Sequence, residues 1–174
     1  MRVGERDKAL ADLSGAVKIA PKFAQALTAR GSVYISQGKI DLALADLNAS
    51  IKIDGKSSVA YNNRALAFLG KNDRARAIAD FSKAIELDPA DATSYAARGS
   101  AYMTGGEKEK AFADFGKALS IDSKNLVALF NRGALYAATK EPEKARADFE
   151  AILAIDPKND NAKKQIAALK NAGG

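Results

Sequence analysis

The chain of 174 residues is 47% hydrophobic and 28% charged, a composition that favours a folded protein over a disordered one. It contains no histidine and no cysteine, which excludes disulfide bonds, thiolate nucleophiles, imidazole general bases and zinc sites built from those ligands. We therefore expect no enzymatic activity and no cofactor. The formal net charge of +6 at pH 7 is compatible with acidic partners or with nucleic acid, but it does not distinguish between the two.

Alanine accounts for 37 of the residues, beside only 5 tyrosines, 7 phenylalanines and 4 prolines. Because alanine loses no side-chain entropy in a helix and is depleted from strands, this composition predicts an all-α protein. The sequence has no run of about 18 apolar residues, so we expect a soluble protein without membrane insertion. The lack of cysteine leaves the compartment open between cytoplasm and periplasm.

Apolar residues recur at helical spacing along the chain, which predicts ten helices. Their expected residues are 5–19, 22–36, 39–53, 58–70, 73–87, 92–104, 107–121, 126–138, 141–155 and 160–170. Side chains suited to capping the free N–H groups of a first turn precede four of these helices, namely Ser57, Asp91, Asn125 and Asn159.

A repeat of about 34 residues organises this series of helices. The segment ALADLSGAVKIAP begins at Ala9, and similar segments follow at one constant interval, beginning at Ala43, Ala77, Ala111 and Ala145. Between them a second element recurs with the same period, as in YAARGSAY, where an arginine and a small residue lie between two tyrosines. Each period therefore holds two helices, and a series of such pairs is typical of a solenoid.

These residues resemble the tetratricopeptide repeat (TPR) family. The family has a large residue, a small residue, an aromatic residue, an alanine, a second aromatic residue and a closing proline, which match Tyr61, Ala65, Phe68, Ala77, Phe81 and Pro89. The resemblance covers nearly the whole chain. It implies an all-α fold, a right-handed α-α superhelix of antiparallel helix pairs, whose concave face binds peptides or partner proteins through the first helix of each pair.

On this resemblance the chain is a single solenoid. A leading half-repeat occupies residues 1–23, four complete repeats occupy residues 24–57, 58–91, 92–125 and 126–159, and a C-terminal capping helix occupies residues 160–174. Because the half-repeat contains only a second helix, its apolar face is expected to lack its usual cover. Self-association into a homo-oligomer through this N-terminal end is therefore an alternative function.

A recurrent arginine and a recurrent aspartate occupy facing positions in neighbouring helices. They are Arg30, Arg64, Arg98 and Arg132 in the first helices and Asp46, Asp80, Asp114 and Asp148 in the second helices. Counting outward from the turns places each arginine about level with an aspartate, so we expect a ladder of partly buried ion pairs that fixes the helix register. The alternative, a phosphate or carboxylate site, agrees less well with four identical copies.

The family's concave face, carried over position by position, predicts an uncharged groove for a partner segment. Its residues are Gln25, Thr28, Ser32, Asn62, Asn63, Leu66, Thr93, Ser100, Met103, Phe130 and Asn131. The asparagines are expected either to hydrogen-bond a peptide backbone or to be solvated. Met103 and Phe130 are the only bulky pair that the spacing suggests, and they either pack in the core or, if exposed, form the binding hot spot.

The family's best-known mechanism clamps the C-terminal carboxylate of a chaperone tail with lysine, arginine and asparagine side chains. The matching positions here hold Thr28, Ser32, Asn63, Thr93 and Ala97, of which only Asn63 fits. The resemblance thus implies a non-catalytic protein-interaction scaffold that is not a carboxylate-clamp co-chaperone. An RNA-binding helical repeat is an alternative of another class, although nucleic acid is not the expected partner because the lysines are dispersed and most aromatic residues belong to the repeat core.

Overall fold

The structure, a computed structural model, describes residues 3–172, with the side chains of residues 7–170. Every regular element in this described part is an α-helix, and there are ten of them, which confirms the predicted all-α fold. The chain divides into two compact units, Met1–Pro89 and Ala90–Gly174, and each is described by itself.

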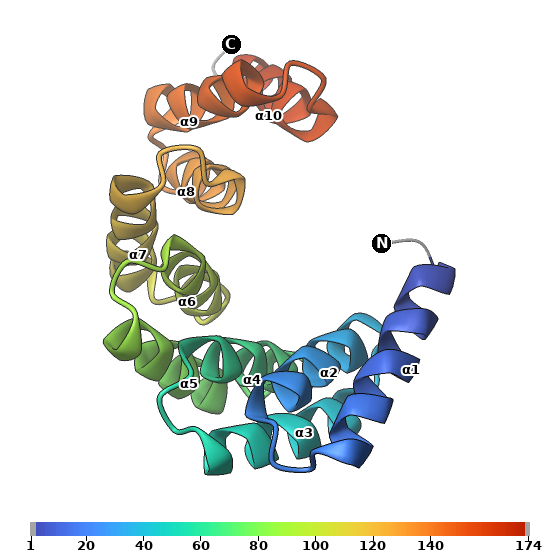
Figure 1. Ribbon diagram of the computed structural model, residues 1–174. Coiled ribbons are helices and arrows are strands. Elements are labelled where there is room, and N and C mark those ends of the chain that lie inside the picture. Colours follow the sequence, from blue (N-terminus) through green and yellow to red (C-terminus); the bar gives the residue numbers. More distant parts are fainter. Residues whose placement is uncertain (1–2, 173–174) are drawn as a thin grey trace. The chain divides into compact units, whose positions relative to one another are not determined.

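The first unit contains helices α1 (Val3–Ile19), α2 (Ala24–Ser36), α3 (Ile40–Ile53), α4 (Ser58–Gly70) and α5 (Arg74–Leu87). Helix α2 packs along α3, and α4 packs along α5, so that these four helices form two pairs (Figure 1). Further contacts join α1 to α2, α3 to α4 and α2 to α4. The first helices of the two pairs, α2 and α4, therefore lie beside each other.

The second unit contains helices α6 (Ala92–Thr104), α7 (Lys108–Ile121), α8 (Leu126–Ala138), α9 (Pro142–Ile155) and α10 (Asp160–Ala172). Its helices form two pairs, as in the first unit: α6 packs with α7, and α8 packs with α9. The unpaired helix is the last one, α10, which packs against both α9 and α8. No helix among the described residues combines the length and the apolar character that a membrane crossing requires.

The observed helices begin and end within two residues of the predicted ones over the described range. The prediction starts α2 at Lys22, but the helix begins at Ala24, the same place of the repeat at which α4, α6 and α8 begin; its N-cap residue is Phe23, which has no side-chain oxygen to accept a hydrogen bond. At the equivalent positions of the next four first helices, the predicted caps accept backbone N–H groups of the first turn: Ser57, Asp91, Asn125 and Asn159.

Small residues at the middle of the first helices allow close packing against the paired helices. A Cβ atom added to Gly99 would lie 2.8–2.9 Å from ring atoms of Phe115, and one added to Gly133 would lie 3.0 Å from the ring of Phe149. Both rings are completely buried. The absent methyl groups thus leave the space that these two aromatic side chains fill.

The turns within the helix pairs reverse the chain through one residue in the left-handed region. This residue occupies the same place in four consecutive repeats, as Gly38 (φ 71°), Asn72 (φ 58°), Gly106 (φ 79°) and Lys140 (φ 62°). Glycine and asparagine tolerate this conformation well, whereas lysine adopts it rarely. The turn geometry therefore follows the repeat even where the sequence does not favour it.

Candidate functional site

Each predicted arginine donates two hydrogen bonds to the aspartate that lies 16 residues further along the chain. Arg30 donates from Nε to Asp46 Oδ2 at 2.7 Å and from Nη2 to Asp46 Oδ1 at 2.8 Å. The same arrangement joins Arg64 to Asp80, Arg98 to Asp114 and Arg132 to Asp148. Two parallel bonds of this kind restrict both the distance and the angle between the paired helices.

These four ion pairs lie at the edge of the hydrophobic core. The aspartates are only 5–7% exposed, whereas the arginine side chains remain 18–25% exposed. The hydrogen bond to aspartate raises the pKa of each arginine, and partial burial opposes this effect. Because the aspartates already engage the guanidinium groups, this geometry supports the role in helix register over capture of a free phosphate or carboxylate.

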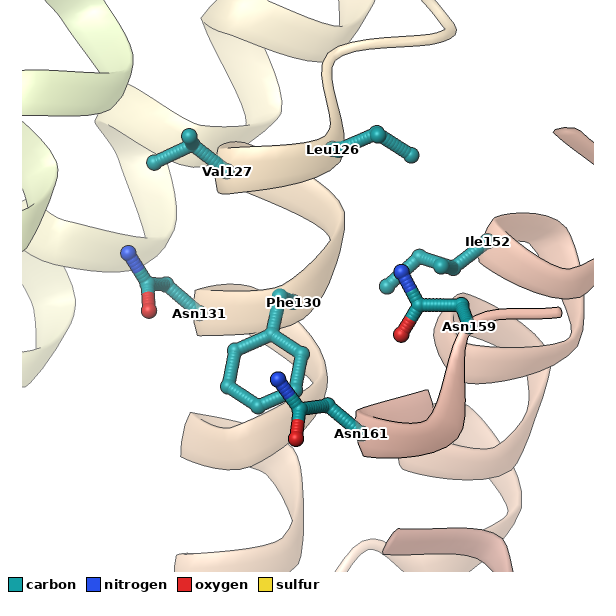
Figure 2. A pocket seen from close by; sticks show the side chains of 7 residues that line it. All are labelled: Leu126, Val127, Phe130, Asn131, Ile152, Asn159 and Asn161. Atoms are coloured by element: carbon teal, nitrogen blue, oxygen red, sulfur yellow. The ribbon is translucent and has the colours of Figure 1, made fainter. Parts of the chain in front are cut away.

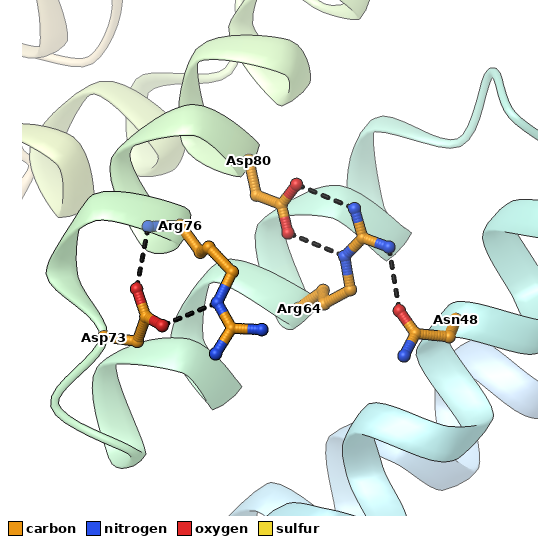
Figure 3. Close-up of polar contacts among 5 residues, drawn as sticks. All are labelled: Asn48, Arg64, Asp73, Arg76 and Asp80. Atoms are coloured by element: carbon orange, nitrogen blue, oxygen red, sulfur yellow. Dashed lines mark hydrogen bonds and ion pairs between the residues drawn. The ribbon is translucent and has the colours of Figure 1, made fainter.

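Arg64 also reaches the preceding helix pair, as Figure 3 shows. Its Nη1 donates to Asn48 Oδ1 at 2.8 Å, so that one side chain of α4 bonds to both α3 and α5. Close by, Asp73 caps α5 and accepts hydrogen bonds from the backbone N–H and the Nε of Arg76. These bonds lower the pKa of Asp73. The bonds of Arg64 therefore link α4 to both α3 and α5, whereas the bonds of Asp73 lie within the first turn of α5.

A hollow of about 440 Å³, here named the α2/α4 hollow, opens between the first helices of the two complete pairs in the first unit. It is lined by Ala24, Gln25, Thr28, Ala29, Ser32, Asp54, Ser57, Val59 and Asn63. The Oγ1 of Thr28 lies 2.7 Å from the Oγ of Ser50, which itself donates to the carbonyl of Ala24 at 2.9 Å. Asp54, which follows the last residue of α3, is the single charged residue in the lining.

A second hollow, of about 290 Å³ and here named the α8/α10 hollow, lies between α8 and α10 in the second unit (Figure 2). Leu126, Val127, Phe130, Asn131, Ile152, Asn159 and Asn161 line it. Phe130 also packs edge-on against the buried Phe149, with 5.7 Å between the ring centroids. Asn131 donates to the Oγ of Ser100 at 2.8 Å, and Asn159 caps α10, which leaves the exposed Asn161 as the amide most open to a ligand.

The two hollows occupy the same place in the repeat. Ala24, Gln25, Thr28 and Ala29 correspond to Leu126, Val127, Phe130 and Asn131, three repeats further along. Their chemistry differs, because the buried Thr28 and Ser50 are replaced by Phe130 and Ile152, which pack in one hydrophobic cluster. We name these two positions the inner pair; it is polar in the α2/α4 hollow and apolar in the α8/α10 hollow.

The predicted groove residues fall into two groups. Those that line one of the hollows are Gln25, Thr28, Ser32, Asn63, Phe130 and Asn131, while Asn62, Leu66, Thr93, Ser100 and Met103 are not part of either lining. Thr28 is buried and bonded to Ser50, so its hydroxyl is not displayed for a partner as the prediction required. Ser100 is likewise engaged, because it accepts from Asn131 and donates to the carbonyl of Ala96.

The structure separates Met103 from Phe130. Met103 packs against the cluster around Phe115, whereas Phe130 packs against the cluster around Phe149. Both side chains are half-buried. Of the two alternatives, core packing therefore describes Met103, whereas Phe130 packs against the core and also lines the α8/α10 hollow.

Sequence reasoning missed several lining residues that do not lie on the predicted face of the first helices. Asp54 and Asn159 lie outside the helices, before a first helix begins, and Ile152 belongs to a second helix. The repeat period itself is a usable signal for Asn161, which occupies the position equivalent to Val59 of the α2/α4 hollow. The sequence predicts an uncharged groove, and the carboxylate of Asp54 corrects this for the α2/α4 hollow.

Comparisons with known proteins agree on one family. Models of the tetratricopeptide repeat match residues 1–58, 58–91, 92–125 and 127–159. The chain matches none of the curated proteins with which it was compared. The fold, by contrast, recurs widely among solved structures.

Three solved structures illustrate this likeness. A structure of MamA is 24% identical, with a TM-score of 0.76 over 92% of this chain and 98% of that one. A thermophilic TPR protein of Thermus thermophilus is 21% identical, with a TM-score of 0.81 over 96% and 91% of the two chains. The first TPR of Spaghetti (RPAP3), bound to the HSP90 peptide SRMEEVD, is 26% identical, with a TM-score of 0.64 over 67% and 93%.

The family models and the structural likeness lead to the same fold, the TPR solenoid predicted from the sequence. Proteins with this fold are typically non-catalytic scaffolds for protein interactions. With the constant repeat period, the paired helices and four matching repeat models in place, the chain belongs to the tetratricopeptide repeat family.

Proposed function

We propose that the chain is a non-catalytic scaffold that holds a peptide segment of a partner protein against the first helices of its repeats. The observation that carries the proposal is the recurrence of a hollow at the same place of the repeat in both compact units. Val59 and Val127, which line these hollows, are 60% and 54% exposed. Covering such apolar side chains with a partner is favourable, because it removes their surface from water.

The polar side chains of the α2/α4 hollow are suited to a peptide backbone. Gln25 and Asn63 each offer an amide group and a carbonyl oxygen, and the exposed Ser32 offers a hydroxyl. Every non-proline residue of a peptide carries one N–H donor and one C=O acceptor that lose their bonds to water on binding. These side chains supply replacement bonds for that backbone.

The same residues support a binding mode other than the carboxylate clamp. The hydroxyl of Thr28 is engaged inside the protein, and neither Ser32 nor Thr93 carries a positive charge. A free carboxylate would therefore find no cation at these positions to compensate for its lost hydration. Spaghetti is bound to an HSP90 peptide in its own structure, and we propose that this chain binds internal peptide segments instead.

The proposal is tested by selecting displayed random peptides on the purified chain and measuring the Kd of a selected peptide by fluorescence anisotropy. For a peptide held in the α2/α4 hollow, the triple variant Gln25→Ala/Val59→Ser/Asn63→Ala should raise Kd about tenfold or more, because several contacts are lost together. For a peptide held in the α8/α10 hollow, Val127→Ser/Asn161→Ala should have that effect.

Leu42→Ser provides a matched control for these variants. Leu42 is also an exposed apolar side chain, but it lies on α3 and lines neither hollow. Its replacement should leave the Kd of every selected peptide unchanged. Selected peptides whose affinities are the same for the wild type and for both hollow variants would remove the hollows from the proposed function.

Self-association is a second candidate function, and one specific surface favours it. Ile19 and Phe23 are 87% and 47% exposed at the corner between α1 and α2, where Phe23 lines a shallow hollow with Ala20, Pro21 and Lys22. Two chains that met there would bury this apolar surface. Sedimentation velocity at increasing concentration should then show a dimer that Phe23→Ser abolishes, and a monomer at all concentrations would contradict this candidate.

A further inference from the structure

The α2/α4 hollow combines one carboxylate with a lining of otherwise neutral side chains. We infer that this hollow binds the cationic head of an arginine or lysine side chain of the partner peptide. This inference rests on the proposed function, because it names the chemistry of a residue that the bound peptide must present. Nothing in the sequence-based groove predicts it, since that groove contains no charged residue.

Asp54 is held so that one of its carboxylate oxygens can accept from a ligand. It follows the last residue of α3 in an extended backbone conformation, and its Oδ1 accepts the backbone N–H of Lys56 at 2.9 Å. That bond fixes the side chain and leaves Oδ2 for a donor from the peptide. The carboxylate is exposed, so a ligand reaches it without displacing a protein group.

The position of Asp54 at the end of α3 strengthens its attraction for a cation. The aligned peptide dipoles of a helix place partial negative charge at the C-terminus, where the last carbonyl groups lack partners within the helix. A cation in the hollow therefore meets both the carboxylate and the C-terminal end of α3. The two effects have the same sign.

The remaining lining fits the rest of a long cationic side chain. Ala24, Ala29 and Val59 offer apolar surface to its methylene groups. Gln25, Ser32 and Asn63 carry oxygen atoms that can accept from the N–H groups that Asp54 does not reach. A guanidinium carries five such donors, so arginine makes fuller use of this lining than lysine does.

The α8/α10 hollow provides an internal contrast. Its lining has no charged residue, and its inner pair is Phe130 and Ile152 rather than Thr28 and Ser50. Asp156 occupies the position equivalent to Asp54 but is not part of this lining, so an ammonium or guanidinium group placed there would lose water without a counter-ion in the lining. We therefore expect selection for a basic side chain in the α2/α4 hollow and not in the α8/α10 hollow.

The positive charges of the chain that lie far from Asp54 oppose a basic ligand only weakly. Charges separated by more than the Debye length of about 8 Å at physiological ionic strength are largely screened. A carboxylate at hydrogen-bond distance is not screened in this way. The formal charge of +6 thus lowers the rate of encounter more than it weakens the contact with Asp54.

The experiment combines a change in the peptide with a change in the protein. Peptides selected on the wild-type chain that lose affinity in the triple variant of the α2/α4 hollow should be enriched in arginine or lysine at one position. Replacing that arginine by the neutral citrulline should raise Kd about tenfold, the loss expected for a charge-assisted hydrogen bond. In Asp54→Asn, the same replacement should change Kd little, because the carboxylate is already absent.

Asp122→Asn is the matched control for Asp54→Asn. Asp122 follows the end of α7 and accepts the backbone N–H of Lys124 at 3.0 Å, the same local bond that Asp54 makes, but it lines neither hollow. Asparagine keeps this acceptor in both variants, so both should fold, as circular dichroism and the midpoint of unfolding will show. Asp122→Asn should leave the effect of citrulline at its wild-type value.

The outcomes separate this inference from the proposed function. Peptides of the α2/α4 hollow without a preferred basic residue, or an equal effect of citrulline in the wild type and in Asp54→Asn, would overturn the inference and leave the scaffold function standing. Failure to select any peptide that depends on either hollow would overturn both. A tenfold effect of citrulline that disappears only in Asp54→Asn would establish the site.

Discussion

Arg64 shows how a single residue joins three helices. It belongs to α4, bonds through two nitrogen atoms to Asp80 of α5, and uses a third nitrogen for Asn48 of α3. Its guanidinium also lies 5.4 Å and 5.9 Å from the ring centroids of Tyr61 and Phe68, distances at which aromatic rings attract cations. Asp80, Asn48 and the two aromatic rings would therefore each lose an interaction if Arg64 lost its charge.

Removing either partner of this ion pair should therefore destabilise the protein, and removing both should cost less than the two single losses added together. Asp80→Asn is expected to lower the free energy of unfolding by about 3 kcal/mol, because Arg64 remains half-buried without its counter-ion. Arg64→Met on its own should also destabilise the protein, by leaving the buried Asp80 unpaired. The double variant Asp80→Asn/Arg64→Met should lose clearly less than the sum of the two single losses.

Urea unfolding monitored by circular dichroism measures these differences. The exposed pair Lys83 and Glu86 serves as a control, since its removal by Lys83→Met should barely change the unfolding curve. A double variant that loses the full sum of both single effects would show that Arg64 and Asp80 do not act as a pair.

The sequence could predict the ladder of ion pairs but not the exposure of single side chains. Arginine and aspartate recur with the repeat, so counting from the turns was sufficient to place Arg30 near Asp46. Thr28 was predicted on the groove face because of its position on the first helix. Its burial depends on Ser50, a side chain of the second helix that lies 22 residues away and bonds to it, and no periodicity of a single helix contains that information.

At the level of paired helices, the distance between two elements depends on one missing methyl group. In α6 and α8 the residue that faces the buried ring of the partner helix is glycine, whereas α4 has the buried Ala65 at the equivalent position. The pair formed by α4 and α5 therefore accommodates a methyl group there, whereas in the pairs of the second unit an added methyl group would lie too close to the ring of Phe115 or Phe149. Glycine at this position is favoured by packing and opposed by helix propensity.

Two glycine-to-alanine substitutions in the second unit separate these effects. Gly116→Ala in α7 should raise the free energy of unfolding by about 1 kcal/mol, because alanine favours the helix and the new Cβ meets no atom within 4 Å. Gly99→Ala in α6 gains the same propensity. Its Cβ, however, would lie 2.8 Å from a ring atom of Phe115 and 3.2 Å from the Cβ of Asp114, so an overpacking penalty of about 1–3 kcal/mol should cancel or reverse the gain.

Scanning calorimetry should therefore order the midpoints of unfolding with Gly116→Ala highest and Gly99→Ala at or below the wild type. The two variants carry the same chemical change and have the same amino-acid composition, so they are controls for each other. The opposite order would show that close approach of α6 and α7 is not what selects glycine at position 99.

For the molecule as a whole, the repeat was the most informative feature of the sequence. One constant period predicted the fold, all ten helices and the family. Because the same pattern occurs in every repeat, a helix boundary that is unclear in one repeat can be placed from the equivalent positions of the others. The hollows were not predictable in this way. Their volume and chemistry depend on positions such as 24, 28 and 59, where the copies differ from one another.

The inner pair has a consequence for how such a chain changes over time. Its two positions hold Thr28 and Ser50, and in the following repeats Asn62 and Ala84, Ala96 and Ala118, then Phe130 and Ile152. The ion pairs and left-handed turns keep the same spacing around each of these combinations. Genetic recombination that exchanges or duplicates whole repeats would therefore reorder the inner pairs along an unchanged backbone. The protein would then prefer a different order of side chains in its partner, without a new fold.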